Sequence, residues 1–282
     1  MRKLKFEKTK YGKELLIDTA DMSDFDRDID AAITNFYIIA SIREGSGYVQ
    51  IGPDRIDLTN HSFLFVAPGV FSEISTANFQ QATWVFFEGE FLDVFFNEKF
   101  FTYKFDFFHG IGRPSALSTK ANEFDDLDRF IQEIHMEIRQ IQFDSEHILR
   151  SSLYLLLIKL NRLYGGTFKT NGIAIQDKRV LRLKYLLENH IQDYQTVEEY
   201  AAQLQISRTH LNTLTRRHFS RSAKDLIHDR LLIESKKELL FSEKGIAEIA
   251  YDLNFSDQSN FNRFFKKKSG MTPSQFRKEF SK

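Results

Sequence analysis

The stretch "GIAEIAYDLNFSDQSNFNRFFKK", residues 245–267, contains two short apolar patterns on either side of a polar break. In the second pattern Phe261 and Phe265 recur at the spacing of one helix face. Ser256 or Asp257 is placed to cap the start of that helix. Because most basic helix faces are merely solvated, this stretch alone leaves two readings open, a surface helix and a helix that enters a DNA groove.

The same layout occurs about fifty residues upstream, in "TVEEYAAQLQISRTHLNTLTRRHF". Ala201 corresponds to Ala250 and Leu204 to Leu253, and the small alanines allow two helices to approach closely. A short helix, a tight turn and a second helix form the helix-turn-helix motif. The sequence therefore predicts two such units in tandem, at about residues 196–219 and 245–268.

Capping residues mark where these helices begin and end. Thr196 and Glu199 fit a capping box at the start of the first unit, and Ser207 is a natural N-cap for its second helix. Gly270 is placed to end the last helix of the second unit, and Thr272 with the following proline starts another helix.

The segment between the two units, "AKDLIHDRLLIESKKELLF", is long enough for one connecting helix. Its apolar residues are expected to pack against both units; they are Leu226, Ile227, Leu231, Ile233 and Leu239. The second helix of each unit is its recognition helix. If the two recognition helices face the same side of DNA, they contact major-groove segments one turn, about 34 Å, apart.

The charge distribution favours a nucleic-acid partner for this half of the chain. The whole sequence has 282 residues and no net charge. Residues 1–174 contain 19 Lys+Arg against 25 Asp+Glu, a difference of −6, and the remainder contains 20 against 14, a difference of +6. A basic half beside an acidic half indicates two separate functions. The basic half is the expected binding site for an anionic polymer such as DNA.

Short strands dominate residues 1 to about 110. "FYIIASI", "GYVQIG", "RIDL", "SFLFVAP" and "TWVFFEG" are rich in β-branched and aromatic residues and are separated by turn signals. Strands at this close spacing predict an antiparallel β-barrel or sandwich.

Two helices are expected in residues 120–164. The first has a helical stripe from Phe124 to Ile138. The second carries Leu149, Leu153, Leu156, Leu160 and Leu163, at the 4-3-4-3 spacing of a coiled-coil seam. The sequence leaves two interpretations open, because these helices could form a homodimer or could simply cover the barrel.

The glycine-containing segment at residues 165–177 has few large apolar residues and is the expected linker. The predicted domains are therefore 1–164 and an all-α domain at 178–282. The chain has no cysteine, and neither a signal peptide nor a membrane span can be recognised, so a cytoplasmic protein is expected.

The last hundred residues resemble the DNA-binding domain of AraC/XylS-type transcription regulators. The resemblance is carried by "AAQLQIS", "RLLIESKKELL" and above all "IAEIAYDLNFSDQSNFNRFFKKKSGMTPSQFR". Two positions depart from the family pattern, in which glycine is usual: Asn254, before the phenylalanine, and Ser220. Asparagine tolerates a positive φ better than most residues, so the turn at Asn254 is expected to be kept.

The N-terminal half is similar to the cupin-like sensor barrel of the same family. The stretch "GSGYVQIGPDRIDLTNHSFLFVAPG" has the alternation of glycine turns and strands that is typical of that barrel. The helices at 120–164 match the family's dimerisation element in position. The resemblance implies a regulator that binds promoter or operator DNA under the control of a small-molecule effector. The sequence assigns no effector-binding residue.

Exposed positions of the two recognition helices are the candidates for base contacts, since Asn and Gln pair with adenine and Arg with guanine. These candidates are Arg208, Thr209, Asn212, Thr213, Gln258, Ser259, Asn262 and Arg263. The candidates for phosphate contacts, which position a protein without reading sequence, are Arg216, Arg217, Lys266 and Lys267. The phenylalanines beside them are expected in the core.

Two other functions compete with DNA binding. A metal-dependent cupin enzyme needs clustered histidines, whereas His61, His109, His135 and His147 are scattered. No catalytic triad, Walker loop or glycine fingerprint is present, so no catalytic residue, metal or cofactor is predicted. A basic helical protein-interaction module is the third possibility.

Overall fold

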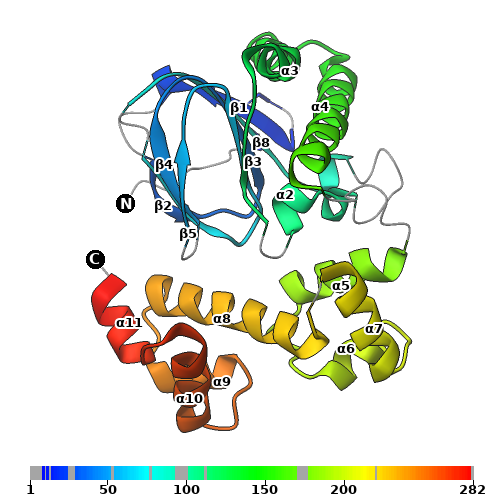
Figure 1. The fold of residues 1–282 in the computed structure, drawn as a ribbon. Coiled ribbons are helices and arrows are strands. Elements are labelled where there is room, and N and C mark those ends of the chain that lie inside the picture. The colour runs from blue at the N-terminus through cyan, green and yellow to red at the C-terminus, as the bar shows by residue number, and fades with distance from the viewer. Residues whose placement is uncertain are drawn as a thin grey trace. The chain divides into compact units, whose positions relative to one another are not determined.

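The structure is a computed structural model that describes residues 8–9, 11–12, 14–24, 29–51, 54–75, 78–92, 101–110, 113–169, 177–219 and 221–280. The chain divides into two compact units, Met1–Gln176 and Asp177–Lys282. The first contains antiparallel sheets and helices, and the described part of the second contains helices alone (Figure 1). The predicted fold class, a β-rich domain with flanking helices followed by an all-α domain, is confirmed at this level.

The described strands of the first unit form two antiparallel sheets. The larger sheet has the order β1 (Ile17–Asp21), β8 (Phe79–Phe87), β3 (Tyr37–Gly45), β6 (Ser62–Val66) and β9 (Ala116–Ser118). The smaller has the order β2 (Ile29–Ile33), β7 (Phe71–Ser75), β4 (Gly47–Ile51) and β5 (Asp54–Leu58). Among these strands the sheets stay separate, so the expected barrel is a pair of sheets rather than one closed sheet.

The larger sheet is buried on both faces. On β3, Ile38 and Ala40 belong to a core shared with Val49 of the smaller sheet. Tyr37 and Ile39, which point to the opposite face, belong to a second core formed with the helices. Strands buried on both faces read as continuous apolar runs, which explains why "FYIIASI" and "SFLFVAP" do not alternate.

A glycine allows the chain to pass from the larger sheet to the smaller one. Gly45 ends β3 with φ +123°, in the region that side chains rarely adopt. A Cβ atom at this position would collide with the carbonyl oxygen of Asn78. The position therefore requires glycine.

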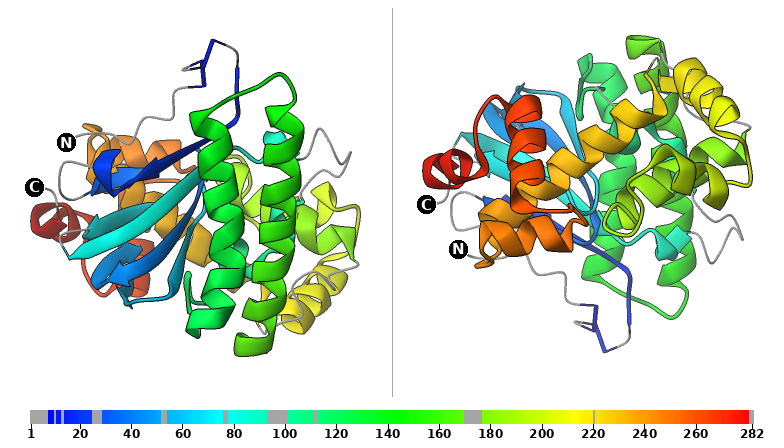
Figure 2. Two further views of the ribbon diagram at one scale, coloured as in Figure 1. Left: turned by 90° about the horizontal axis from the view of Figure 1, so that it is seen from above. Right: turned by 90° about the horizontal axis from the view of Figure 1, so that it is seen from below.

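Helices α3 (Ala121–Arg139) and α4 (Ser145–Phe168) run side by side and cover the outer face of the larger sheet (Figure 2). The leucines of the predicted seam point into this unit's own core: Leu149, Leu153, Leu156 and Leu160 are all 0% exposed, and Leu163 packs against the same cluster. The covering interpretation is therefore correct for the four fully buried leucines, which are not available to a second molecule.

Helix α4 extends into the segment expected to be linker. Residues 165–168 are helical, and Lys169 ends the helix with φ +51°. Two contacts of Tyr164 stabilise this end, because its hydroxyl donates to the Pro114 carbonyl at 2.7 Å and its ring packs 4.6 Å from that of Phe168. The rest of the predicted linker, up to residue 176, lies outside the described residues.

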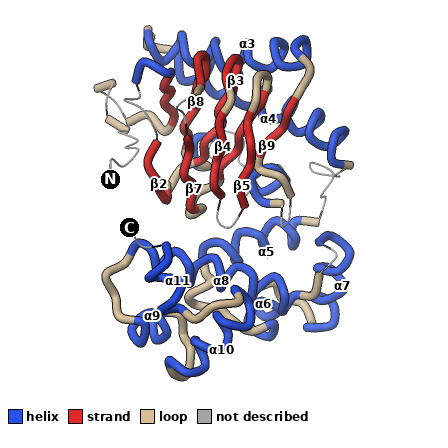
Figure 3. The backbone as a smooth tube through the Cα atoms, turned by 60° about the vertical axis from the view of Figure 1, so that its left-hand side comes forward, coloured by secondary structure: helices blue, strands red, loops and turns tan. Residues whose placement is uncertain are grey.

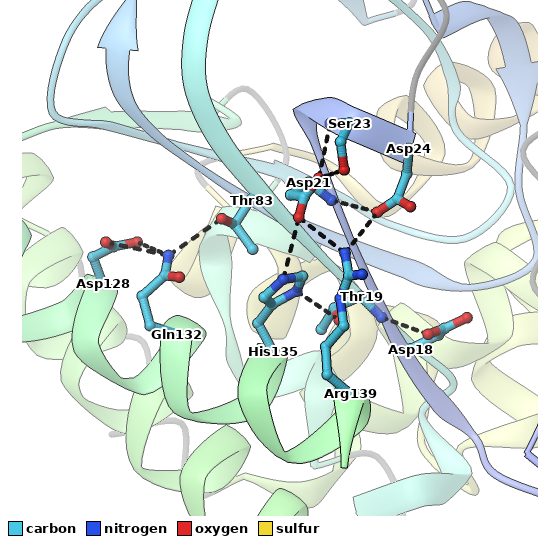
Figure 4. A network of polar contacts seen from close by, with 10 residues as sticks. All are labelled: Asp18, Thr19, Asp21, Ser23, Asp24, Thr83, Asp128, Gln132, His135 and Arg139. Atoms are coloured by element: carbon cyan, nitrogen blue, oxygen red, sulfur yellow. Dashed lines mark hydrogen bonds and ion pairs between the residues drawn. The ribbon is translucent and has the colours of Figure 1, made fainter. Parts of the chain in front are cut away.

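Polar side chains line the seam between α3 and the larger sheet (Figure 4). The buried carboxylate of Asp128 pairs with Arg43 at 2.7 Å. Further along α3, His135 and Arg139 both contact Asp21 at the end of β1, at 3.3 and 2.9 Å. Short helical turns complete the unit: η1 (Met22–Asp24), η2 (Thr102–Lys104) and α2 (Asp106–His109).

The second unit is a bundle of helices (Figure 3). They are α5 (Lys178–Asn189), α6 (Val197–Gln203), α7 (Arg208–Phe219), α8 (Ala223–Phe241), α9 (Ile246–Asp252), α10 (Gln258–Ser269) and α11 (Pro273–Phe280). None of the helices within the described ranges is long and apolar enough to cross a membrane.

Helix α8 is the predicted connector, with one correction. Ile233 was expected to pack against both units, but it is 44% exposed. The inner face at this point is occupied by Glu234, which is 4% exposed and pairs with Arg230 at 3.2 Å and Lys237 at 3.0 Å. Apolar spacing alone could not reveal this buried carboxylate.

Tyr200 on α6 is fully buried, and its hydroxyl has no hydrogen-bond partner among the described residues. The equivalent position on α9 is Ile249. Because a buried unpaired hydroxyl is destabilising, we expect Tyr200→Phe to leave the free energy of unfolding unchanged or raise it by up to about 1 kcal/mol. Denaturant titration of the two proteins at pH 7 measures the difference.

The same variant should change the response to alkaline pH. Burial raises the pKa of Tyr200, so the hydroxyl stays protonated in the folded state when an unfolded tyrosine ionises near pH ~10. Stability should therefore fall as pH rises above this value, and Tyr200→Phe should lose less than the wild type. A lower stability of the variant at pH 7 would show that the hydroxyl has a partner.

Candidate nucleic-acid interface

The two helix-turn-helix units have matching turns. Gln205 follows α6 with φ +56° and Asn254 follows α9 with φ +54°. One residue later, the Ile206 N–H donates to the Ala201 carbonyl at 3.0 Å, and in the second unit the Phe255 N–H donates to the Ala250 carbonyl at 2.9 Å. The expected positive φ at Asn254 is confirmed; Ser220, the other departure from the family pattern, lies outside the described residues.

The predicted caps are present. Thr196 and Glu199 form the capping box of α6, and hydrogen bonds from Thr196 and the Gln195 N–H lower the pKa of Glu199 although burial opposes this. Ser207 accepts the His210 N–H at 3.1 Å. In the second unit Asp257, not Ser256, is the N-cap, and it accepts the Asn260 N–H at 2.7 Å. The second turn is therefore one residue longer.

Apolar residues hold each recognition helix against its own unit. Leu211 and Leu214 of α7 are buried, as are Phe261 and Phe265 of α10. Phe255 and Phe264 are partly buried and lie 5.2 Å apart, measured between ring centroids. The opposite sides of α7 and α10 are thus left for contacts outside the protein.

In the first unit, Arg208, Thr209 and Thr213 are exposed on α7. The Arg208 guanidinium lies 2.7 Å from Glu198 of α6, but both side chains are more than half exposed. Such surface pairs contribute little, so Arg208 can exchange Glu198 for a nucleic-acid partner at small cost. The hydroxyl of Thr213 donates to the Thr209 carbonyl at 3.0 Å.

In the second unit, Gln258, Ser259 and Arg263 are exposed on α10. Arg263 donates to the amide oxygen of Asn260. The nearby Asp257 carboxylate is used to cap α10. Because Asn260 is neutral, it leaves the positive charge of Arg263 available to a DNA partner.

The two asparagines predicted to contact bases are partly buried. Asn212 donates to the Arg208 carbonyl and accepts the Ala223 N–H, both at 3.2 Å, so it ties α7 to the start of α8. Asn262 occupies the matching place on α10, and its Oδ1 accepts no hydrogen bond within the described part of the chain. The counterpart of Ala223 there is Pro273, which has no N–H to donate.

The predicted phosphate contacts Arg216, Arg217, Lys266 and Lys267 are all exposed at the C-terminal ends of α7 and α10. Lys268 differs from them, because its ammonium lies 3.0 Å from Asp229 of α8. Nearby, burial and the charges of Lys268 and Lys224 lower the pKa of His228. The sequence pattern "KKK" gave no sign that its third lysine is paired internally.

The site expected of a metal-dependent cupin is not formed by the residues that the structure describes. No group of three His, Asp or Glu side chains there could hold a metal ion. The histidines have separate surroundings: His109 contacts the Tyr37 hydroxyl at 2.9 Å, His135 contacts Thr19 at 3.0 Å, and His61 lies beside Phe124.

Two adjacent units with matched turns, buried inner faces and exposed basic outer faces define a DNA-binding protein of the tandem helix-turn-helix class. Comparisons with known proteins agree, since residues 200–279 match the helix-turn-helix domain family. The chain is similar to AraC-type transcription regulators, and its C-terminal unit contains the matched helix-turn-helix domain.

Its relatives include regulators from several bacteria. The Msm operon regulatory protein of Streptococcus mutans is 26% identical over 256 residues, which are 88% of this chain and 86% of that protein. The raffinose operon regulatory protein RafR of Pediococcus pentosaceus is 29% identical over 46% of this chain and 47% of its own length. The solved structure of ToxT from Vibrio cholerae covers 94% of this chain and 98% of its own, with 15% identity and a TM-score of 0.45.

Proposed function

We propose that this regulator reads promoter sequence with α7 and α10 together, each through the exposed residues near its N-terminal end. The supporting observation is the repeat itself, because in both units a recognition helix of 12 residues follows a turn that contains one positive-φ residue, Gln205 or Asn254. The base-reading residues in this proposal are Arg208, Thr209 and Thr213 in the first unit and Gln258, Ser259 and Arg263 in the second. Asn212 positions α7, and the Oδ1 atom of Asn262 is buried with no hydrogen-bond partner among the described residues.

The proposed phosphate contacts can be tested by salt titration. Each phosphate contact releases condensed counterions, so the slope of log affinity against log salt reports their number. We expect Lys266→Ala to reduce this slope by about one unit. Lys268→Ala is the matched control, because Lys268 pairs with Asp229, and its slope should equal that of the wild type. Fluorescence anisotropy with a labelled promoter duplex gives both values.

Two results would count against the proposal. Equal slopes for Lys266→Ala and the wild type would remove Lys266 from the interface. Absence of binding to promoter DNA at low salt, with or without candidate metabolites, would refute DNA reading altogether and favour a protein-interaction module.

The first unit is proposed to sense a small-molecule effector, and residues 178–282 to form the DNA-binding domain. Support comes from an open pocket of about 300 Å³ between α3 and the larger sheet, lined in part by residues of the network in Figure 4. Its lining offers both donors and acceptors, including Ser41, Arg43, Thr83, Asp128 and Gln132. A small polar molecule fits this chemistry. In this proposal the protein is a cytoplasmic regulator and not an enzyme, as the names of its relatives suggest.

A homodimer formed through residues 120–164 is also proposed, but through a different face from the leucine seam. Four apolar side chains of these helices and their connection are exposed: Met136 (70%), Phe143 (101%), Ile148 (44%) and Leu155 (45%). Ile148 and Leu155 are seven residues apart and so lie on one side of α4. Exposed apolar side chains of this size are suited to contact with another protein surface.

A further inference from the structure

The segment between α5 and α6 contacts the turn of the second helix-turn-helix unit. The side-chain amide of Asn254 donates to the Gln192 carbonyl at 2.5 Å. The side-chain amide of Gln195 donates to the carbonyl of Leu253, the residue before Asn254. Two hydrogen bonds thus join residues about sixty positions apart in sequence.

This contact lies beside the first helix of the first unit. Gln195 directly precedes Thr196, the N-cap of α6, and its N–H donates to the capping carboxylate of Glu199 at 2.9 Å. Movement of the segment would therefore move the start of α6. The contact links the first unit to the turn on which α10 depends.

The same segment is also attached to the connecting helix. The Gln192 side chain donates to Glu234 of α8 at 3.3 Å, and Glu234 is held by Arg230 at 3.2 Å. Arg230 in turn donates to the Glu188 carbonyl at the end of α5 at 3.3 Å. Three parts of the unit, namely the end of α5, the middle of α8 and the α9–α10 turn, thus meet at one small polar cluster.

We propose that Asn254, with Gln192 and Gln195, is a positioning element that sets the spacing of the two recognition helices and hence the spacing of the two DNA motifs that the protein accepts. This inference rests on the proposed reading of DNA by both helices. If helix α8 were the sole connection, one helix-turn-helix unit could rotate about the α8 axis relative to the other. Such a rotation would change the register of α10 on the duplex. The hydrogen bonds to the turn oppose that rotation.

Asn254 suits this role because both its backbone and its side chain contribute to the turn. Its backbone adopts φ +54°, which asparagine tolerates, while its side chain reaches Gln192. Asn254→Gly keeps access to positive φ and removes the side chain, and Asn254→Asp keeps the shape and removes the amide donor. Gln205→Gly is the matched control, because Gln205 is exposed and occupies the same place in the first unit's turn with φ +56°.

The test uses the full chain and duplexes obtained by selection from random DNA. The distance between the two motifs is then shortened or lengthened by one base pair, and affinities are measured by anisotropy. We expect the wild type and Gln205→Gly to prefer the selected spacing. Both Asn254 variants should reduce this preference by about two- to tenfold, which is the net worth of one hydrogen bond. Their melting temperatures provide a check on folding.

The outcomes separate this inference from the proposed function. If the wild type binds no selected duplex, the proposed function fails and the inference fails with it. If the wild type shows the preference and both Asn254 variants keep it in full, only the inference is overturned. An equal loss in Gln205→Gly would also overturn it, because the effect would then belong to either turn and not to the contact with Gln192.

Discussion

Replacement of Phe261 by alanine should lower the free energy of unfolding of the C-terminal unit by about 3–5 kcal/mol, the usual cost of removing a buried phenylalanine. Phe261 is 0% exposed, and its ring lies 5.2 Å from that of Phe255 and 5.9 Å from that of Phe265. The cavity left behind removes the support of α10. Because domains of this size are stable by only about 5–15 kcal/mol, DNA affinity should fall with the folded fraction.

Denaturant unfolding followed by circular dichroism measures the loss, and anisotropy measures binding. Arg263→Ala is the matched control, since it lies two residues along the same helix but is exposed. It should change stability by less than about 0.5 kcal/mol and, as the proposed base contact, weaken specific binding by about 1–3 kcal/mol. If Phe261→Ala unfolded at the wild-type denaturant concentration, the assignment of Phe261 to the core would be wrong.

Leu153→Ala is the second change with a large expected effect. Leu153 is 0% exposed in the core between α4, α3 and the larger sheet, and truncation of such a leucine costs about 2–5 kcal/mol. The loss should appear in the first unit and should not depend on protein concentration, because the residue packs within its own chain. Unfolding curves at several protein concentrations test this.

Leu155 provides the comparison, two residues further along the same helix and 45% exposed. Leu155→Ala should alter stability within about 0.5 kcal/mol but weaken self-association measured by sedimentation, as the homodimer proposal requires. The opposite result would be that Leu153→Ala dissociates a dimer and leaves the first unit stable. It would show that the leucine seam forms the interface between two molecules.

Local signals in the sequence were sufficient for most of the helical unit. The capping pair Thr196 and Glu199, the turn at Asn254 and the stop at Gly270 depend on residues close together in the chain, and each is present as expected. The repeat added independent support, since two similar segments are expected to fold alike. Helical spacing also gave most of the exposed faces of α7 and α10, except that Asn212 and Asn262 are partly buried.

The remaining features depend on partners that are distant in sequence. The 4-3 spacing of Leu149 to Leu163 specifies a buried stripe but not which surface buries it. Strand pattern likewise indicated β structure without specifying how the strands divide between sheets. Lys268 has ordinary helical surroundings in sequence, and its pairing with Asp229, 39 residues earlier, sets its position. Beside Ile233, the buried Glu234 accepts a hydrogen bond from Gln192, which is 42 residues earlier.

The burial of the larger sheet on both faces limits where this regulator can diversify. Substitutions along β3, β6 and β8 must satisfy two cores at once, so few replacements are neutral there. The strand ends, the smaller sheet and the outward side of α3 carry no such double constraint. Over evolutionary time, substitutions should therefore accumulate at these margins, while the central strands vary little among descendants of this chain.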